Sequence, residues 1–451
     1  MHEAWKGKRV LVVGMARSGK AAAELLCSLD ARAVLSDAKP AVEGLEELVR
    51  LGCISRLGEP AEALAEGCDA VIVSPAVPSD APVIHRAKAL GIPLMAELEF
   101  AAQFVRGAMV AVTGTNGKTT TCALAGEILR NAGRHTFVAG NIGLPLSAVA
   151  LQTGADDTCV VEVSSFQLEN MHAFHPAGAA ILNLTPDHLN RHGTMEAYGS
   201  LKESMLQNQV ETDFFIYNAD DPFCAAVASR AKAETIPFSA TRQLGLGAWV
   251  QEGQVMVAGR ALCGVEELSL KGRHNLENAL AAAAIAMRFE TPAAVIRHTL
   301  RSFQGVEHRM ETVRELGGVR YINDSKGTNP ESSTHAVLAM DRPTVLIAGG
   351  EDKGMGFEGF ASAIVENKNI RHVVLIGRAA ETIRAALEKE GYAHCAMAGA
   401  DFEKAVALAR SLLAEGGTVL LSPACASFDM FKDFEARGNA FKEIVNALES
   451  R

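Results

Sequence analysis

Short apolar runs rich in valine, isoleucine, leucine and alanine alternate along the chain with amphipathic stretches of helical length. The first hundred residues predict strands at 9–14, 33–37 and 70–75, and helices at 18–29 and 85–90. Because strands that alternate with helices indicate βαβ units, we expect a parallel sheet covered by helices.

The same alternation continues to the end of the chain, with shorter strands and few helix signals over 230–271. Further strands are predicted at 158–163, 178–184, 213–218, 319–322, 344–348, 372–376 and 418–421, and a further helix at 195–207. The helical spacing of Phe434, Phe441, Ile444 and Leu448 indicates packing in a core. We therefore expect an α/β protein of three domains. These are a Rossmann-like domain at 1–104, a central P-loop-type ATPase domain with a mostly parallel sheet at 105–307, and a Rossmann-like domain at 308–451.

Composition narrows the class of protein. The 451 residues are 48% apolar and 21% charged, as in an ordinary globular protein. Interspersed charges with a net value of −10 argue against a nucleic-acid surface. No apolar run reaches the roughly 18–20 residues of a membrane span, and the N-terminus shows no signal peptide. Nine scattered cysteines without a Cys-x-x-Cys pair are typical of a reducing compartment. We expect a cytoplasmic protein without nucleic-acid binding or membrane insertion.

The segment 109–121, MVAVTGTNGKTTT, joins an apolar run, a glycine turn and a Lys-Thr pair that opens an alanine-rich helical stretch. This order predicts a phosphate-binding loop, because backbone N–H groups and the positive end of the helix face an anion there. The lysine adds charge near the terminal phosphates, and a threonine hydroxyl suits Mg²⁺. The spacing is two residues shorter than in the usual P-loop. We expect ATP or a close relative to bind at Gly114, Thr115, Asn116, Gly117, Lys118, Thr119 and Thr120.

A second glycine motif lies near the N-terminus, between Gly14 and Gly19. With Asp37 it resembles a dinucleotide fingerprint, although Ala16 replaces the glycine that approaches a pyrophosphate. It also fits the P-loop spacing, but Ala21 stands where a hydroxyl should hold Mg²⁺. A nucleotide site of another kind is still expected where these strands end.

Polar residues follow several other predicted strands. Glu162 ends a buried run, where a P-loop protein places its Mg²⁺ partner and where an unpaired carboxylate would be costly. Four histidines have a spacing that would allow a zinc site: His172, His175, His188 and His192. We disfavour this site, because Pro176 breaks the helix of the first pair and no cysteine joins the histidines. On the residues alone, Lys202 is an ordinary helix-surface lysine.

Two amides, Asn275 and Asn278, share one face of a predicted helix, where they cap a backbone or bind a base edge. In the last third, polar and glycine residues recur after each predicted strand, as at Asp324 and Ser422. The carboxyl ends of parallel strands are where an open α/β sheet places its site.

Five segments in this order resemble the motifs of the Mur ligase family: Gly114-Thr-Asn-Gly-Lys-Thr-Thr, Glu162-Val-Ser-Ser-Phe-Gln-Leu-Glu, Asn183-Leu-Thr-Pro-Asp-His, Gly272-Arg-His-Asn and Asn323-Asp-Ser-Lys. The resemblance covers essentially the whole chain. Within the family, three features are similar to the D-glutamate-adding branch. Asn116 stands where alanine-adding relatives typically have histidine, the Asp-Asn-Pro-Arg signature of another branch is absent, and the ending from Ser422 to Gly438 matches.

The resemblance implies an ATP-dependent ligase of peptidoglycan precursor synthesis. ATP would phosphorylate the terminal carboxylate of UDP-N-acetylmuramoyl-L-alanine, and the amine of D-glutamate would displace the phosphate. Lys118, His188 and Lys202 would be catalytic. Thr119 and Glu162 would hold one Mg²⁺, and His188 a second together with Lys202, carbamylated by CO₂. We expect a monomer.

The resemblance also assigns residues around the nucleotides and the amino acid. Asn275, Arg309 and Asp324 would hold adenine, phosphate and ribose. The D-glutamate pocket would be lined by Thr328, Lys353, Ser427 and Phe434. Asn141, Asp37 and Ser74 would contact the UDP-sugar. The sequence departs from the family at Ala38, Lys39 and Ala76, so UDP contacts are not carried over to these three.

Other functions remain open. A ligase of the same fold with another substrate is the first, as in another Mur ligase or a folylpolyglutamate synthase, although the latter generally lacks a separate N-terminal nucleotide domain. An ATP-gated regulatory protein is the second, although it needs no second metal site of the Glu162, His188 and Lys202 kind. An NAD-dependent oxidoreductase is the third and depends on the first glycine motif alone.

Overall fold

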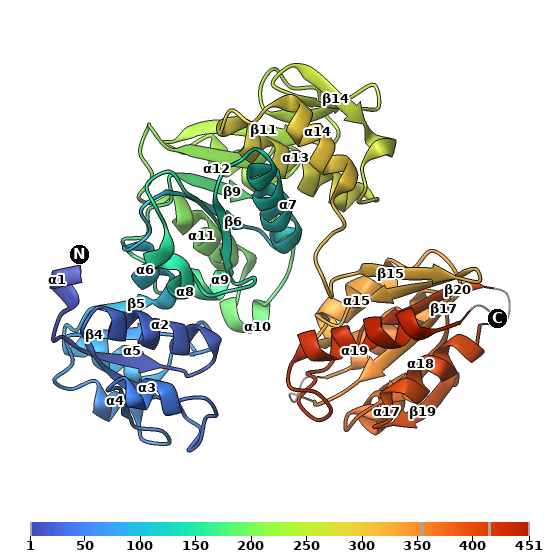
Figure 1. Cartoon of the computed structure of the whole chain (residues 1–451), viewed down its shortest axis with the longest axis horizontal. Coiled ribbons are helices and arrows are strands. Elements are labelled where there is room, and N and C mark those ends of the chain that lie inside the picture. Colours follow the sequence, from blue (N-terminus) through green and yellow to red (C-terminus); the bar gives the residue numbers. More distant parts are fainter. Residues whose placement is uncertain (1, 353–355, 414–415, 450–451) are drawn as a thin grey trace. The chain divides into compact units, whose positions relative to one another are not determined.

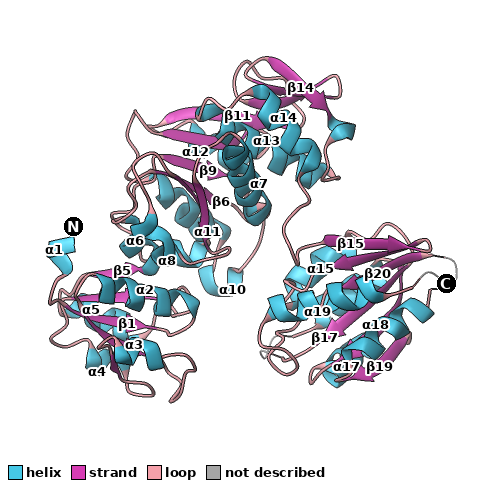
Figure 2. Ribbon diagram, in the orientation of Figure 1, coloured by secondary structure: helices cyan, strands magenta, loops and turns pink. Residues whose placement is uncertain are grey.

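Three β-sheets, each with its own helices, organise the computed structural model (Figure 1). The structure describes residues 2–352, 356–413 and 416–449. The chain forms two compact units, Met1–Phe303 with two of the sheets and Gln304–Arg451 with the third. Helices alternate with strands along the chain in each of the three domains (Figure 2), and most neighbouring strands are parallel. The predicted α/β class with three domains is therefore confirmed.

The N-terminal sheet has the order β3-β2-β1-β4-β5 and is parallel throughout. Its central strand is apolar on both faces because both are covered: Val10 packs in the core that contains α2, and Leu11 in the core that contains Ile84 of α5. The elements are α1 (His2–Trp5), β1 (Arg9–Val13), α2 (Arg17–Ser28), β2 (Arg32–Ser36), α3 (Glu46–Arg50), β3 (Ile54–Ser55), α4 (Ala61–Leu64), β4 (Ala70–Val73), α5 (Pro82–Ala89), β5 (Leu94–Ala96) and α6 (Glu97–Ala102).

The central sheet has the order β14-β13-β12-β11-β10-β9-β6-β8-β7. It is parallel from β7 to β12, and antiparallel hairpins join β12, β13 and β14, which are the short strands predicted in 230–271. The elements are β6 (Ala108–Thr113), α7 (Lys118–Asn131), β7 (Thr136–Gly140), α8 (Leu146–Val149), β8 (Thr158–Glu162), α9 (Ser165–Leu168), β9 (Gly178–Ile181), α10 (Leu189–His192), α11 (Met195–Glu203), β10 (Phe214–Asn218), α12 (Pro222–Ala228), β11 (Glu234–Ser239), β12 (Ala248–Gln251), β13 (Gln254–Val257), β14 (Arg260–Gly264), α13 (Arg273–Arg288) and α14 (Ala293–Ser302).

The C-terminal sheet has the order β15-β16-β20-β17-β18-β19, with the edge strand β15 antiparallel to β16. The two faces of β17 pack in separate cores, one with Leu346 and one with Val345. The elements are β15 (Glu311–Leu316), β16 (Val319–Asn323), α15 (Pro330–Leu338), β17 (Thr344–Gly349), α16 (Glu358–Glu366), β18 (Ile370–Ile376), α17 (Ala380–Lys389), β19 (Cys395–Gly399), α18 (Phe402–Ser411), β20 (Gly417–Leu421) and α19 (Phe434–Ala447).

Two predicted helices differ in detail from the structure. The helix expected at 85–90 begins at Pro82, because a proline suits the first helical turn, where its missing N–H costs nothing. In the last helix Phe441 is buried as predicted, and Ile444 packs against the same core. Phe434 instead opens the helix, with its ring 6.2 Å from that of His308.

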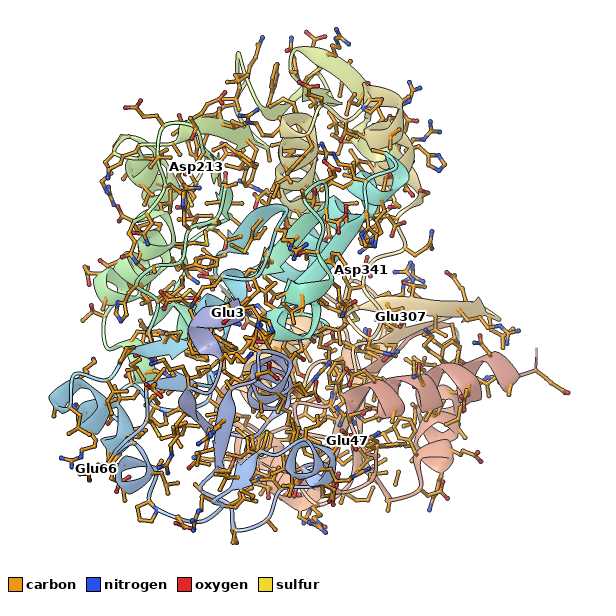
Figure 3. The ribbon with its side chains drawn as sticks, turned by 60° about the vertical axis from the view of Figure 1, so that its left-hand side comes forward. Glu3, Glu47, Glu66, Asp213, Glu307 and Asp341 are labelled. Atoms are coloured by element: carbon orange, nitrogen blue, oxygen red, sulfur yellow. The ribbon has the colours of Figure 1, made fainter. Side chains whose placement is uncertain are left out.

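Charged side chains lie over the outside of the N-terminal domain. Glu66 pairs with Arg86 across 3.5 Å, and Glu47 with Arg50 across 2.8 Å (Figure 3). All four are well exposed, so these pairs add little to stability. Across the helices that the structure describes, none has the length and apolar character needed to span a membrane.

Candidate active site

The glycine loop connects β6 to α7 in the central domain. Gly114 and Gly117 have φ angles of +150° and +85°, which L side chains rarely adopt. The N–H groups of Thr115 and Asn116 donate to Oδ1 of Asn183, at 3.1 and 2.9 Å. The loop is therefore held from the segment that follows β9, and Asn183 is a supporting residue that sequence reasoning did not assign to any role.

Two lysine amines contact this loop from inside the domain. Nζ of Lys118 donates to the backbone oxygens of Gly114 and Thr115, at 2.9 and 2.7 Å. Nζ of Lys202 donates to the same Gly114 oxygen at 2.9 Å and lies 4.3 Å from the centre of the Tyr198 ring. Lys202 is 1% exposed, so it is not the surface lysine that its helix position suggests. Burial, reinforced by the charge of Lys118, lowers the pKa of Lys202 well below its ordinary value.

Glu162 ends β8 beside the first turn of α7. Its Oε2 accepts a hydrogen bond from Oγ1 of Thr119 at 2.8 Å, and its Oε1 accepts one from Nδ2 of Asn141 at 2.8 Å. Glu162 is 2% exposed. A hydroxyl and a carboxylate oxygen side by side are the hard oxygen ligands that Mg²⁺ takes, so this donor set fits the ion. Thr120, on the same helical turn, is half-buried.

His188 lies just before α10, in the left-handed region at φ +52°. Its Nε2 is 3.4 Å from Oδ2 of Asp187, and its ring centre is 4.8 Å from that of Phe166. Burial lowers the pKa of His188, with smaller contributions from the charges of Lys118, Lys202 and Arg191, while Asp187 opposes them. A neutral imidazole is the form that ligates a metal ion.

The amide pair at the start of α13 touches the glycine loop. Oδ1 of Asn278 accepts from Oγ1 of Thr121 at 3.3 Å, and Nδ2 of Asn278 donates to Oδ1 of Asn275 at 3.4 Å. The two amides thus share one helix face, as their spacing indicates. A Cβ added at Gly117 would lie 2.1 Å from Oδ1 of Asn278, so this contact requires glycine in the loop.

In the N-terminal domain, the predicted contact residues surround the first glycine turn. Asp37 accepts from the N–H groups of Met15 at 2.7 Å and of Lys39 at 3.0 Å. Ser74 is buried, and its hydroxyl donates to the oxygen of Gly14 at 2.6 Å. Both side chains therefore shape the turn, and their contacts with a nucleotide remain predictions.

Two of the other histidines considered for zinc, His175 and His192, have side-chain partners of their own. Nε2 of His175 lies 2.6 Å from Oδ2 of Asp213, and Nε2 of His192 lies 3.0 Å from the hydroxyl of Ser165. The backbone N–H of His172 donates to Glu99 at 2.9 Å.

In the C-terminal unit, Asp324 follows β16 and is buried. Its carboxylate accepts from the hydroxyl of Ser422 at 2.7 Å and from the N–H of Met310 at 3.2 Å. Burial raises the pKa of Asp324 to about 6, and the charge of Arg309 is among the weaker opposing effects. Arg309 itself is exposed.

The residues predicted for an amino-acid pocket are spread over three segments of this unit. Thr328 is half-buried after β16, Ser427 is buried after β20, and Phe434 opens α19. Lys353 lies outside the described residues. Arg437, which sequence reasoning did not single out, is 1% exposed.

Arg437 ties these segments together. Its Nε donates to the hydroxyl of Ser325 at 3.0 Å, and its Nη atoms donate to the backbone oxygens of Cys425 and Ala426. Burial lowers its pKa to about 10, so the guanidinium is charged at neutral pH. In the sequence, the only feature that pointed to Arg437 was its position in the motif Phe434-Glu-x-Arg-Gly.

Sequence models of one protein family match nearly the whole chain. The Mur ligase MurD-like N-terminal domain matches residues 8–96, the Mur ligase middle domain 112–286, and the Mur ligase glutamate ligase domain 308–425. A relative from Caldanaerobacter subterraneus subsp. tengcongensis, named UDP-N-acetylmuramoylalanine–D-glutamate ligase, is 44% identical over 98% of this chain and 99% of its own length. A relative of the same name from Pelotomaculum thermopropionicum is 46% identical, over 98% of both chains.

Solved structures share the fold. The UDP-N-acetylmuramate-alanine ligase of Thermotoga maritima superposes with a TM-score of 0.61 over 98% of this chain and 99% of its own, at 20% identity. A MurF structure from Acinetobacter baumannii gives 0.60 over 96% and 93%, also at 20% identity. The sequence matches extend through all three domains and include the glycine loop and both of its lysines. The chain belongs to the Mur ligase family.

Proposed function

We propose that the protein is an ATP-dependent amide ligase that joins D-glutamate to UDP-N-acetylmuramoyl-L-alanine, with ADP and phosphate as the other products. The full-length relatives named for this reaction support the choice of substrates. A carboxylate is a poor electrophile, and transfer of the terminal phosphoryl group of ATP to its oxygen creates a good leaving group. The amine of D-glutamate then forms the amide bond as phosphate departs.

The observation that carries this proposal is the pair of lysines on the glycine loop. A protein that only binds ATP needs the one loop lysine, Lys118, for its charge near the terminal phosphates. Here a second lysine, Lys202, is buried against the same loop with a lowered pKa. A lowered pKa means that the amine loses its proton more readily, and in its neutral form it would react with CO₂ to give a carbamate, which is an anion. The site would thereby gain a second negative group near His188.

Mg²⁺, when bound, supplies positive charge that neutralises the transferred phosphoryl group. Thr119 and Glu162 would hold one ion, and His188 with carbamylated Lys202 would orient a second. Lys118 would contact the terminal phosphates, and residues 114–120 would enclose them. Asn275, Arg309 and Asp324 would hold the rest of ATP. Catalysis would then depend on position and charge, without a covalent bond to the protein.

The domains would divide the substrates between them. Residues 1–104 would bind the UDP end of the sugar nucleotide through Asp37 and Ser74, and residues 105–307 would bind ATP, with Asn141 toward the sugar. Residues 308–451 would bind D-glutamate through Thr328, Lys353, Ser427 and Phe434. We propose that the protein acts in the cytoplasm as a monomer.

The proposal is tested by phosphate release from the full-length protein with ATP, Mg²⁺ and UDP-N-acetylmuramoyl-L-alanine, while the amino acid is varied. Release that depends on D-glutamate supports it. Release with another amino acid would move the protein to a sister activity of the same fold. No release with any amino acid, when Lys118→Ala serves as the blank, would overturn the proposed substrates.

A further inference from the structure

One arginine links the loop that carries His188 to the N-terminal domain. Arg191 lies in α10, three residues after His188. Its Nη2 donates to the backbone oxygen of Val77 at 2.9 Å and approaches that of Pro75 at 3.4 Å. These two oxygens belong to the loop after β4, in the N-terminal domain of the same compact unit.

The guanidinium is held rigidly from its own domain. Its Nε and Nη2 donate to the two carboxylate oxygens of Glu169, at 2.8 and 2.6 Å. Its central carbon lies 4.5 Å from the centre of the Phe166 ring. The side chains of Arg191 and Glu169 are only 21% and 8% exposed. A planar donor that is stacked and bound at two points has one orientation, so the remaining bonds to the loop are directed.

Both ends of this contact adjoin a proposed site. On the N-terminal side, Ser74 precedes Pro75 directly, and its hydroxyl bonds to Gly14 of the glycine turn at 2.6 Å. On the central side, the Phe166 ring that Arg191 covers also contacts the His188 ring, with centres 4.8 Å apart. Arg191 therefore spans from the turn proposed to hold the UDP end to the histidine proposed for the reacting end.

A second contact stabilises the same arrangement. Nη2 of Arg17, at the start of α2, donates to the oxygen of Gly143 in the central domain at 2.8 Å. Gly143 is two residues after Asn141, which bonds to Glu162. Each domain thus reaches a backbone oxygen of the other with an arginine. Loss of Arg191 alone leaves the Arg17 contact in place.

We infer that Arg191 is a positioning residue, which fixes the loop at 75–77, and with it the bound sugar nucleotide, at a set distance from His188. The inference rests on the proposed function, and it names a residue that acts through others and not on the reacting atoms. A carboxylate that is held at the wrong distance from the phosphoryl donor reacts slowly, since small displacements of reactants are costly.

The test is steady-state kinetics of the full-length protein with Arg191→Ala, Arg191→Lys and a matched control, Arg230→Ala. Arg230 makes the same two-point pair, with Glu203, but bonds only within the central domain in its described contacts. Arg191→Ala should raise the KM for the sugar nucleotide about 10- to 100-fold, as expected for lost charged hydrogen bonds, and lower kcat. The KM for ATP should change less than about threefold, because the glycine loop is untouched.

Two further experiments distinguish a positioning role of Arg191 from a general effect on the stability of the protein. Millimolar methylguanidinium should restore part of the sugar-nucleotide affinity of Arg191→Ala and have no effect on Arg230→Ala. Arg191→Lys keeps the charge beside Glu169, but a single ammonium group cannot donate to the carboxylate and to both carbonyls at once, as the planar guanidinium does. It should fold normally and still show the raised KM, so it decides the question if the alanine variant does not fold.

Three results would overturn the inference. They are an unchanged sugar-nucleotide KM in both Arg191 variants, equal changes in the KM of every substrate, and a matching change in Arg230→Ala. If wild-type protein shows no D-glutamate-dependent turnover, the proposed function fails separately. The variants are then compared by calorimetric titration with UDP-N-acetylmuramoyl-L-alanine alone, and absence of binding by wild type, or equal binding by wild type and variants, would overturn the inference as well.

Discussion

Lys118 and Lys202 donate to one backbone oxygen, that of Gly114, and each N–O distance is 2.9 Å. Two ammonium groups so close together repel each other, and the more deeply buried one loses its proton more readily. Burial and the charge of Lys118 lower the pKa of Lys202 accordingly. Two amines thus meet at one loop oxygen, and the carbamate proposed for Lys202 would remove the repulsion between their charges.

Lys202→Arg should reduce kcat at least about 100-fold, the size of effect seen when a positioned charge is lost from an active site. Arginine stays protonated and forms no carbamate, and added bicarbonate should therefore not restore the rate. Lys232→Arg, at an exposed lysine of the same domain, is the control and should leave turnover unchanged. Near-normal turnover of Lys202→Arg would remove the carbamate from the mechanism.

Gly117→Ala should weaken ATP binding as well as stability. Its φ of +85° costs an alanine about 1–2 kcal/mol, and the new Cβ would lie 2.1 Å from Oδ1 of Asn278. Gly133→Ala is a close control, because its φ is +83° and nothing lies within 4 Å of an added Cβ. The midpoint temperature of thermal unfolding should be lower in both variants than in wild type, and lowest in Gly117→Ala. Only Gly117→Ala should raise the KM for ATP. Equal unfolding midpoints would show that the Asn278 contact relaxes freely.

Glu97→Gln should stabilise the protein increasingly as the pH rises. Burial raises the pKa of Glu97, while the Ser147 N–H, 2.9 Å from Oε1, partly opposes this. Because the folded pKa is above the unfolded one, the favourable neutral form is fully present below about pH 4.3 and is lost as the pH passes the raised value. Glutamine stays neutral, so its advantage in unfolding midpoint should be absent at pH 4 and grow above it. Glu24→Gln, at an exposed site on α2, should show no such trend.

Arg437→Lys should destabilise the C-terminal unit by about 2–5 kcal/mol, since a buried charge loses several of its hydrogen bonds. Lysine cannot span Ser325 and the oxygens of Cys425 and Ala426, which lie 3.0 to 3.3 Å from the guanidinium nitrogens. Chemical denaturation of the full chain measures the loss. Arg378→Lys, whose side chain is 75% exposed, should change stability little, and a similar effect in both variants would contradict a structural role for the buried bonds.

Local order along the chain made the glycine loop predictable. Most of a strand, a turn that needs positive φ and the start of a helix lie within the thirteen residues 109–121, and Glu162 ends the strand beside β6, as in a P-loop arrangement. The same local rules misjudged Lys202, because helix spacing gives the face of α11 but not what covers that face. Its buried amine bonds to the backbone oxygen of Gly114, 88 positions away in the sequence.

Contacts between domains were beyond sequence reasoning for the same physical reason. Arg191 and Val77 are 114 residues apart, and neither has a local pattern that indicates the other. Asn183 appeared only as part of a motif, while its bonds to Thr115 and Asn116 depend on how β9 lies beside β6. The spacing of residues predicts which face of a helix or strand a side chain lies on. The roles of Arg191 and Asn183 depend instead on which elements lie next to each other in the folded chain.

The short helix α6 has a consequence for how the protein can be divided. It follows β5 directly in the N-terminal domain, yet its buried carboxylates bond to central-domain backbone: Glu97 to Ser147, and Glu99 to His172 and Ala173. A fragment that ends at 104 would carry two carboxylates without these donors, and one that begins at 105 would leave three amides without acceptors. A cut at 104–105 would therefore break three hydrogen bonds to buried carboxylates, whereas a cut at 303–304 falls between the two compact units.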